Sequence, residues 1–268
     1  MSAQSLSLSS RARGALRGAL AGARGAAVPL GLLRILAEEL AAGRVDLRVV
    51  AERWADYARG ARVDDETAAA LEYLDRHHAP PEHSEARGPA PLARVLPIAL
   101  LAFDSPRNLV SATFHTAALT HPDPHPAWAA VAVNVALATF LQGKRDFVPA
   151  VLAALRGNAA PEGLLAAVRR VPLRRREGLP DPAAAGTDAV AAAETALWLA
   201  YHEPLIARGL GTLENAGQSS TPAAIAAGAL LGARDGAKTV PAALVPGASE
   251  LEDWDALADR LVRVTAPV

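Results

Sequence analysis

The amino-acid sequence predicts an all-α protein, a single compact orthogonal helical bundle. Alanine is its most frequent residue, and of its 268 residues 51% are apolar but only 4% are aromatic. Alanine favours helices and lets them pack closely. No segment alternates apolar and polar residues as a half-buried strand does. We expect a flexible segment over residues 1–10 and one domain over residues 11–268.

Apolar spacing and helix-capping residues predict helices along most of the chain. In chain order these cover 11–27, 32–42, 47–59, 65–77, 92–102, 106–119, 127–141, 146–155, 161–170, 187–201, 222–234 and a last helix from about 249. The N-caps are residues whose side-chain oxygens accept hydrogen bonds from the free N–H groups of a first turn. The candidates are Asp46, Asp64 or Asp65, Ser105, Thr221 and Ser249. The Pro-rich stretches 79–91 and 172–186 predict loops, and Pro97 predicts a kink.

Two helices carry glycines at four-residue spacing, Gly14 to Gly22 and Gly228 to Gly236. This spacing places small residues on one helical face, where another backbone can approach closely. We therefore expect these two helices to pack against each other in the middle of the bundle.

Composition excludes several classes of protein. A net charge of −1 argues against a nucleic-acid-coating protein. The absence of cysteine excludes disulfides, thiolate metal sites and a thiol nucleophile. The start of the chain lacks a signal-peptide pattern. The apolar stretch 127–141 is shorter than the roughly 20 residues of a membrane span, so a buried core helix is the better interpretation. We expect a soluble, cytoplasmic protein with neither a membrane nor a nucleic-acid partner.

The sequence contains few motifs that indicate a catalytic, metal or anion site. The acidic run Asp64 to Thr67 has the oxygen ligands of a hard cation, but capping and the helix dipole explain it more simply. The hydroxyls of Ser219, Ser220 and Thr221 precede a helix and suit either an anion or capping. No metal-binding spacing, serine-nucleophile turn or phosphate-binding loop is present.

Five segments in order resemble the ADP-ribosylglycohydrolase family, all-helical enzymes that remove ADP-ribose from modified side chains. They are the opening helix Arg13–Gly22, the passage Ala41–Trp54, the segment Ala93–Leu100, the turn Ala118–Pro124 and the closing helix Thr221–Pro241. The turn contains Leu-Thr-His-Pro-Asp-Pro, which is very similar to the family's own turn. The resemblance implies an all-helical fold and a site that holds two magnesium ions through Asp residues.

At the positions matched to those Asp residues, this chain has no carboxylate. The Gly-Asp of the opening helix is Gly22-Ala23, and the Thr-Asp-Asp-Thr loop is reduced to Val28-Pro29-Leu30-Gly31. In the closing motif, Gln218 and Ser220 stand where the family has Asp, and only Thr221 is retained. Magnesium needs carboxylates to balance its charge. We therefore expect no bound metal and no catalytic residues of the family type.

Three functions remain open. We expect a catalytically inactive relative that binds or scaffolds, with ADP-ribose or an ADP-ribosylated protein as partner. The ligand-contacting candidates at family-matched positions are Gln218, Ser220, Thr221, Arg94 and His121. The alternatives are an active hydrolase of ADP-ribosyl N- or O-linkages whose site is altered or metal-free, and a purely structural, crystallin-like protein. For His121 a structural role, bonding nearby backbone, is favoured over a ligand role. The resemblance favours a monomer.

Overall fold

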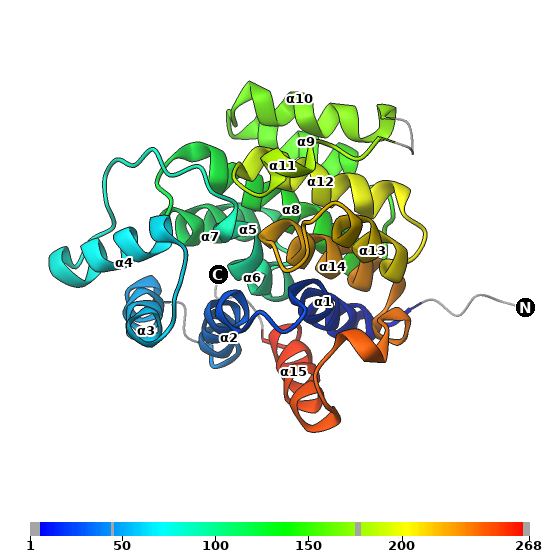
Figure 1. Ribbon diagram of the computed structural model, residues 1–268, viewed down its shortest axis with the longest axis horizontal. Helices are drawn as coiled ribbons and strands as arrows, with labels where there is room; N and C mark the ends of the chain where they lie inside the picture. Colours follow the sequence, from blue (N-terminus) through cyan, green and yellow to red (C-terminus); the bar gives the residue numbers. More distant parts are fainter. Residues whose placement is uncertain (1–5, 44–45, 175–177, 265–268) are drawn as a thin grey trace, which may run out of the picture.

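The computed structural model describes residues 6–43, 46–174 and 178–264, and all regular secondary structure in these ranges is helical (Figure 1). The all-α prediction is confirmed. The α-helices are α1 Leu8–Ala23, α2 Ala27–Ala41, α3 Leu47–Gly60, α4 Asp65–His77, α5 Ala90–Arg94, α6 Leu96–Leu101, α7 Pro106–Ala118, α8 Pro124–Leu141, α9 Val148–Gly157, α10 Glu162–Arg170, α11 Pro182–Ala185, α12 Ala189–His202, α13 Ile206–Asn215, α14 Pro222–Asp235 and α15 Ala248–Leu261. Short 3₁₀ turns are η1 Val171–Leu173, η2 Ala237–Thr239 and η3 Ala242–Leu244.

The glycine faces of α1 and α14 pack directly against each other, as the sequence predicts. A Cβ added to Gly18 would lie 1.9 Å from the backbone oxygen of Gly228, and one added to Gly14 would lie 2.1 Å from that of Gly232. Because Gly14 faces Gly232 while Gly18 faces Gly228, the two helices run antiparallel. No side chain larger than hydrogen fits at these crossing points, so the glycines set the distance between the helices.

The helix α8 is the long apolar helix of the core. Among the described residues, it is the one helix whose length and mean hydropathy would also suit a membrane span, but 83% of that 18-residue window is buried inside the protein. The interpretation of 127–141 as a buried core helix is confirmed. The helices α3 and α4 lie at the left edge of Figure 1, α15 lies at the bottom, and α9 and α10 lie at the top.

Several boundaries differ from the sequence prediction. The helix α1 begins at Leu8 because Ser7 caps it by accepting a hydrogen bond from the N–H of Ser10. Residues 8–10 of the predicted N-terminal segment are thus helical, and residues 1–5 lie outside the described ranges. The helix α2 begins five residues early, at Ala27, because Pro29 is tolerated in a first turn.

Three further outcomes concern a kink, a cap and a helix that was not predicted. The helix predicted over 92–102 is divided at Val95, just ahead of Pro97, into α5 and α6, so the predicted kink is confirmed. A proline lacks the N–H that would continue the helical ladder. The last helix begins at Ala248 with Gly247 as N-cap, so the prediction of Ser249 as a cap is wrong. The helix α13 is not predicted from the sequence, because Gly209 and Gly211 lower its helix propensity.

Candidate functional site

The five predicted site residues lie at two places in the fold. Arg94, at the end of α5, and His121, in the turn before α8, contact each other directly. Gln218, Ser220 and Thr221 lie in the segment that leads into α14.

Arg94 is buried, with a side chain enclosed by the helices around it. Its Nη1 donates to Thr67 Oγ1 at 3.0 Å, and its Nη2 lies 3.1 Å from Nδ1 of His121. Its guanidinium lies over the ring of Trp54, 5.5 Å from the centroid. Burial lowers the pKa of Arg94 to about 10, partly offset by the nearby carboxylates of Asp64 and Glu66. Arg94 is therefore a buried cation held by polar side chains and one aromatic face.

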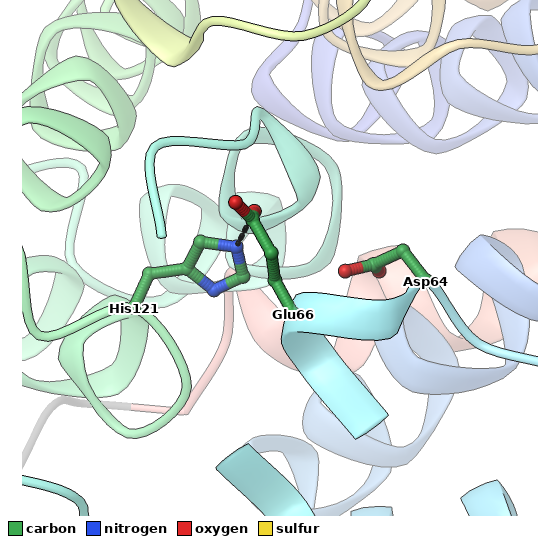
Figure 2. A group of neighbouring side chains, drawn as sticks. All are labelled: Asp64, Glu66 and His121. Carbon is green, nitrogen blue, oxygen red and sulfur yellow. Dashed lines mark hydrogen bonds and ion pairs between the residues drawn. The ribbon is translucent and has the colours of Figure 1, made fainter. Parts of the chain in front are cut away.

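The contacts of His121 determine which of its ring nitrogens carries the proton. A guanidinium only donates hydrogen bonds, so Nδ1 of His121 accepts from Arg94. The ring proton is then on Nε2, which donates to Oε2 of Glu66 at 3.2 Å (Figure 2). Burial, and next the charge of Arg94, lower the pKa of His121 to about 3. The ring is therefore neutral at physiological pH.

Glu66 connects this cluster to the loop that precedes α5. Its Oε2 also accepts the N–H of Gly88 at 2.9 Å. A Cβ at residue 88 would lie 2.1 Å from the same oxygen, so the close approach requires glycine. The other side of this loop is held by the carbonyl of Arg87, which accepts the N–H of Ala189 at 2.9 Å. Glu66 and α12 thus fix residues 87–88 from two directions.

Asp64, Glu66 and His121 form a candidate metal centre by spacing. Among the described residues they are the one group of three His, Cys, Asp or Glu side chains close enough to share an ion, with ligand atoms within 4.8 Å of one another. The carboxylate of Asp64 points toward Glu66 in Figure 2. However, Nε2 of His121 carries the ring proton and has no lone pair to offer a metal. The guanidinium of Arg94 behind it also repels a cation, so the protonation of this group does not fit a metal ion.

The segment before α14 uses its polar groups mainly to begin the helix. Oγ1 of Thr221 accepts the N–H of Ala224 at 3.2 Å and donates to the carbonyl of Gln218 at 2.9 Å. Ser220 has a positive φ of 62°, and Gly217, three residues earlier, has a φ of 71°. Oε1 of Gln218 is buried and has no hydrogen-bond partner among the described residues. The capping prediction for Thr221 is confirmed, and Gln218 offers a free acceptor beside it.

The other family-matched positions are apolar and packed. Ala23 is fully buried at the end of α1. Val28 and Leu30 lie in the first turns of α2 and pack against the core. A Cβ on the neighbouring Gly31 would meet the ring of Tyr57. None of these side chains has an oxygen ligand for magnesium.

The cluster of Arg94, His121 and Glu66 was only partly predicted from the sequence. Asp64 caps α4, as predicted, by accepting the N–H of Thr67 at 2.9 Å. The prediction that the ring of His121 bonds nearby backbone is wrong, since its partners are the side chains of Arg94, Thr120 and Glu66. Glu66 lies 55 residues from His121 in the sequence, and no local pattern predicts their contact.

Comparisons with known proteins identify relatives of this helical fold. The family model described as ADP-ribosylglycohydrolase matches residues 27–267. A solved structure described as an ADP-ribosylglycohydrolase-related protein complex covers 96% of this chain and 98% of that chain, with 22% identity and a TM-score of 0.78. At that identity the likeness shows the fold alone. A search of curated proteins found no match. Because the family model matches most of the length of this chain, the chain belongs to the ADP-ribosylglycohydrolase family.

Proposed function

We propose that this protein is a catalytically inactive member of its family, which binds ADP-ribose or an ADP-ribosylated protein without magnesium. The observation that carries the proposal is the chemistry of the matched positions, where Ala23, Gln218 and Ser220 replace acids. Magnesium sites depend on carboxylates for charge balance, and neutral amides and hydroxyls do not supply it. The hydroxyl of Thr221 is already engaged in capping α14.

Two features support a retained binding role. Gln218 keeps a buried acceptor with no partner among the described residues, at the start of α14. The loop before α5 is held in place by Glu66, which accepts the N–H of Gly88. A preorganised loop costs little to order when a ligand binds, and an unpaired acceptor is available to a ligand donor.

A thermal-shift titration with ADP-ribose, with magnesium or with EDTA, tests the proposal. We expect ADP-ribose to raise the melting temperature equally in both conditions, and magnesium alone to leave it unchanged. Gln218→Ala should weaken ADP-ribose binding by about five-fold, the value of one hydrogen bond. Asn215→Ala, an exposed residue at the end of α13, is the matched control and should bind normally.

Two results would overturn the proposal. One is stabilisation by ADP-ribose only when magnesium is present, which would indicate a metal site built from other residues. The other is release of ADP-ribose from a modified protein by stoichiometric amounts of the chain. Absence of any shift with ADP-ribose would instead support the structural, crystallin-like alternative.

An active hydrolase with a metal-free site is the second candidate, and one observation favours it. Glu66 lines a cavity of about 550 Å³ and is hydrogen-bonded to the neutral ring of His121. A carboxylate so placed is suited to act as a base or nucleophile. This alternative predicts release of ADP-ribose that EDTA does not affect and that Glu66→Gln abolishes, whereas Glu72→Gln on the exposed side of α4 leaves it intact.

We further propose that the protein acts as a cytoplasmic monomer. Light scattering on the purified chain should give the mass of one chain, with and without ADP-ribose. A dimer at micromolar concentration would contradict this part of the proposal.

A further inference from the structure

A second cavity, away from Arg94, His121 and the segment before α14, lies between the α1–α2 junction and the segment from η3 into α15. Its volume is about 700 Å³, within the range of small-molecule sites. None of the five family-matched site residues lines it. Leu30 and Gly31 of the shortened segment 28–31 do line it, so the cavity lies next to that segment but contains none of the candidate ligand-contacting residues.

The lining of this cavity has a basic part and an apolar part. Arg24 and Arg34 contribute two guanidinium groups, while Leu30, Val245 and Trp254 contribute apolar surface. Each arginine uses one nitrogen on a carboxylate, Nη2 of Arg24 on Glu214 and Nε of Arg34 on Glu38. Neither of these glutamates lines the cavity.

Trp254 joins the two parts of the lining. The guanidinium of Arg34 lies over its ring, 5.5 Å from the centroid. Only 3% of Trp254 is exposed. Its Nε1 donor has no hydrogen-bond partner among the described residues. Buried indole N–H groups normally find an acceptor, so this donor is available to a hydrogen-bond acceptor.

The backbone at Arg24 is also unusual. Its φ is +45° and that of the following Gly25 is +79°. The left-handed region is common for glycine at a helix end but unfavourable for arginine. The chain thus accepts local strain at a residue whose side chain lines the cavity.

We propose that this cavity binds a small organic anion with a flat apolar body. The negative group would lie between Arg24 and Arg34, and the apolar body would lie against Leu30, Val245 and Trp254. Guanidinium groups pair well with carboxylates, sulfonates and phosphates. Glu250 also lines the cavity, and its charge opposes such a ligand.

Calorimetric titration with naphthalene-2-sulfonate and with neutral 2-naphthylmethanol tests the proposal, since the two ligands share one ring system. We expect the sulfonate to bind one site with a Kd at least ten-fold lower than that of the alcohol. Arg34→Gln should weaken sulfonate binding about ten-fold. Arg76→Gln is the matched control, because Arg76 likewise pairs with a glutamate one turn away but lies on α4. Glu250→Gln should strengthen binding two- to three-fold.

A steric pair of variants locates the site. Ala243 lines the cavity and is exposed, whereas the neighbouring Ala242 is exposed and does not line it. Ala243→Trp should abolish sulfonate binding, while Ala242→Trp should leave it unchanged. Equal affinity for the sulfonate and the alcohol, full binding by Ala243→Trp, or no sulfonate binding at millimolar concentration would each overturn the proposal. None of these results tests the proposed binding of ADP-ribose beside the segment that leads into α14.

Discussion

Single residues in the Arg94 cluster show how burial sets protonation. Arg94, His121 and Glu66 form a chain in which a cation donates to a neutral ring and the ring donates to a carboxylate. Each group supplies a hydrogen-bond partner for the next, which lowers the cost of burying them, while Nε of Arg94 has no partner among the described residues. The same chain prevents Nε2 of His121 from acting as a metal ligand.

The lowered pKa of His121 predicts a loss of stability in mild acid. Between the unfolded value near 6.5 and the folded value of about 3, the unfolded chain binds a proton that the folded protein does not. The free energy of unfolding therefore falls as the pH falls, by up to about 1.4 kcal/mol per pH unit. We expect urea unfolding to show a loss of about 2 kcal/mol between pH 7 and pH 5 from this residue.

The variant His121→Asn isolates this contribution. It should be less stable than the natural protein at pH 7, because Arg94 and Glu66 lose a partner, but its stability should change less between pH 7 and pH 5. His115→Asn, at an exposed position on α7, should keep the original pH dependence. Parallel pH profiles for the natural protein and His121→Asn would contradict the assignment.

Asp259 on α15 is a second single residue whose contacts stabilise the fold. It accepts hydrogen bonds from Ser9 Oγ at 2.6 Å and from Nε of Arg13 at 3.1 Å, and so ties α15 to α1. The hydrogen bond from Arg13 is the main reason that the pKa of Asp259 is lowered. Asp259→Asn should lower the free energy of unfolding by about 1 kcal/mol, since Arg13 is partly exposed.

The pH dependence of Asp259→Asn provides its check. A carboxylate with a lowered pKa stabilises the fold above its unfolded value and loses this effect as the pH falls through its folded value. The difference between Asp259→Asn and the natural protein should therefore be constant from pH 7 to pH 5 and shrink below about pH 4. The exposed Asp253→Asn serves as control. A difference that persists in strong acid would show that packing, not charge, is the cause.

Among the helices, the pairing of α1 with α14 is the clearest case of sequence controlling packing. Gly18→Ala would place a Cβ 1.9 Å from the Gly228 oxygen, where backbone cannot yield cheaply. We expect a loss of about 3 kcal/mol or more in the free energy of unfolding, measured by urea denaturation.

The matched control is another glycine inside a helix. Gly211 lies within α13, and a Cβ there would meet nothing within 4 Å. Gly211→Ala should raise stability by up to about 1 kcal/mol, because alanine has the higher helix propensity. If both variants changed stability by similar amounts, close packing would not be the reason for the glycines of α1.

Some helices could be predicted from local sequence signals such as capping residues, and others could not. Asp46, Asp64 and Thr221 cap their helices as predicted, because a cap depends only on the next few residues. The helix α13 has weak propensity because of its glycines, but Ile206, Leu210 and Leu213 follow helical spacing and are buried by packing. Tertiary burial overrides weak propensity in such a segment.

At the scale of the whole molecule, one core cluster includes residues from both ends of the chain. It contains Leu16 of α1, Leu137 of α8 and Leu261 of α15. A continuous core favours cooperative unfolding of a single domain. We expect one urea transition, with coincident curves from tryptophan fluorescence and far-UV circular dichroism. Two separated transitions would show that residues 11–268 are more than one folding unit.

The sequence by itself determined the helical class, most helix starts, and the contact between the glycine faces of α1 and α14. These depend on backbone propensity, capping and side-chain size, which act over a few residues or at a fixed spacing. Only the tertiary structure decided the partners of His121, its neutral state and the cavity beside Trp254. Those depend on which distant segments enclose a side chain, because burial and neighbouring charge, rather than residue type, set its hydrogen bonds and its pKa.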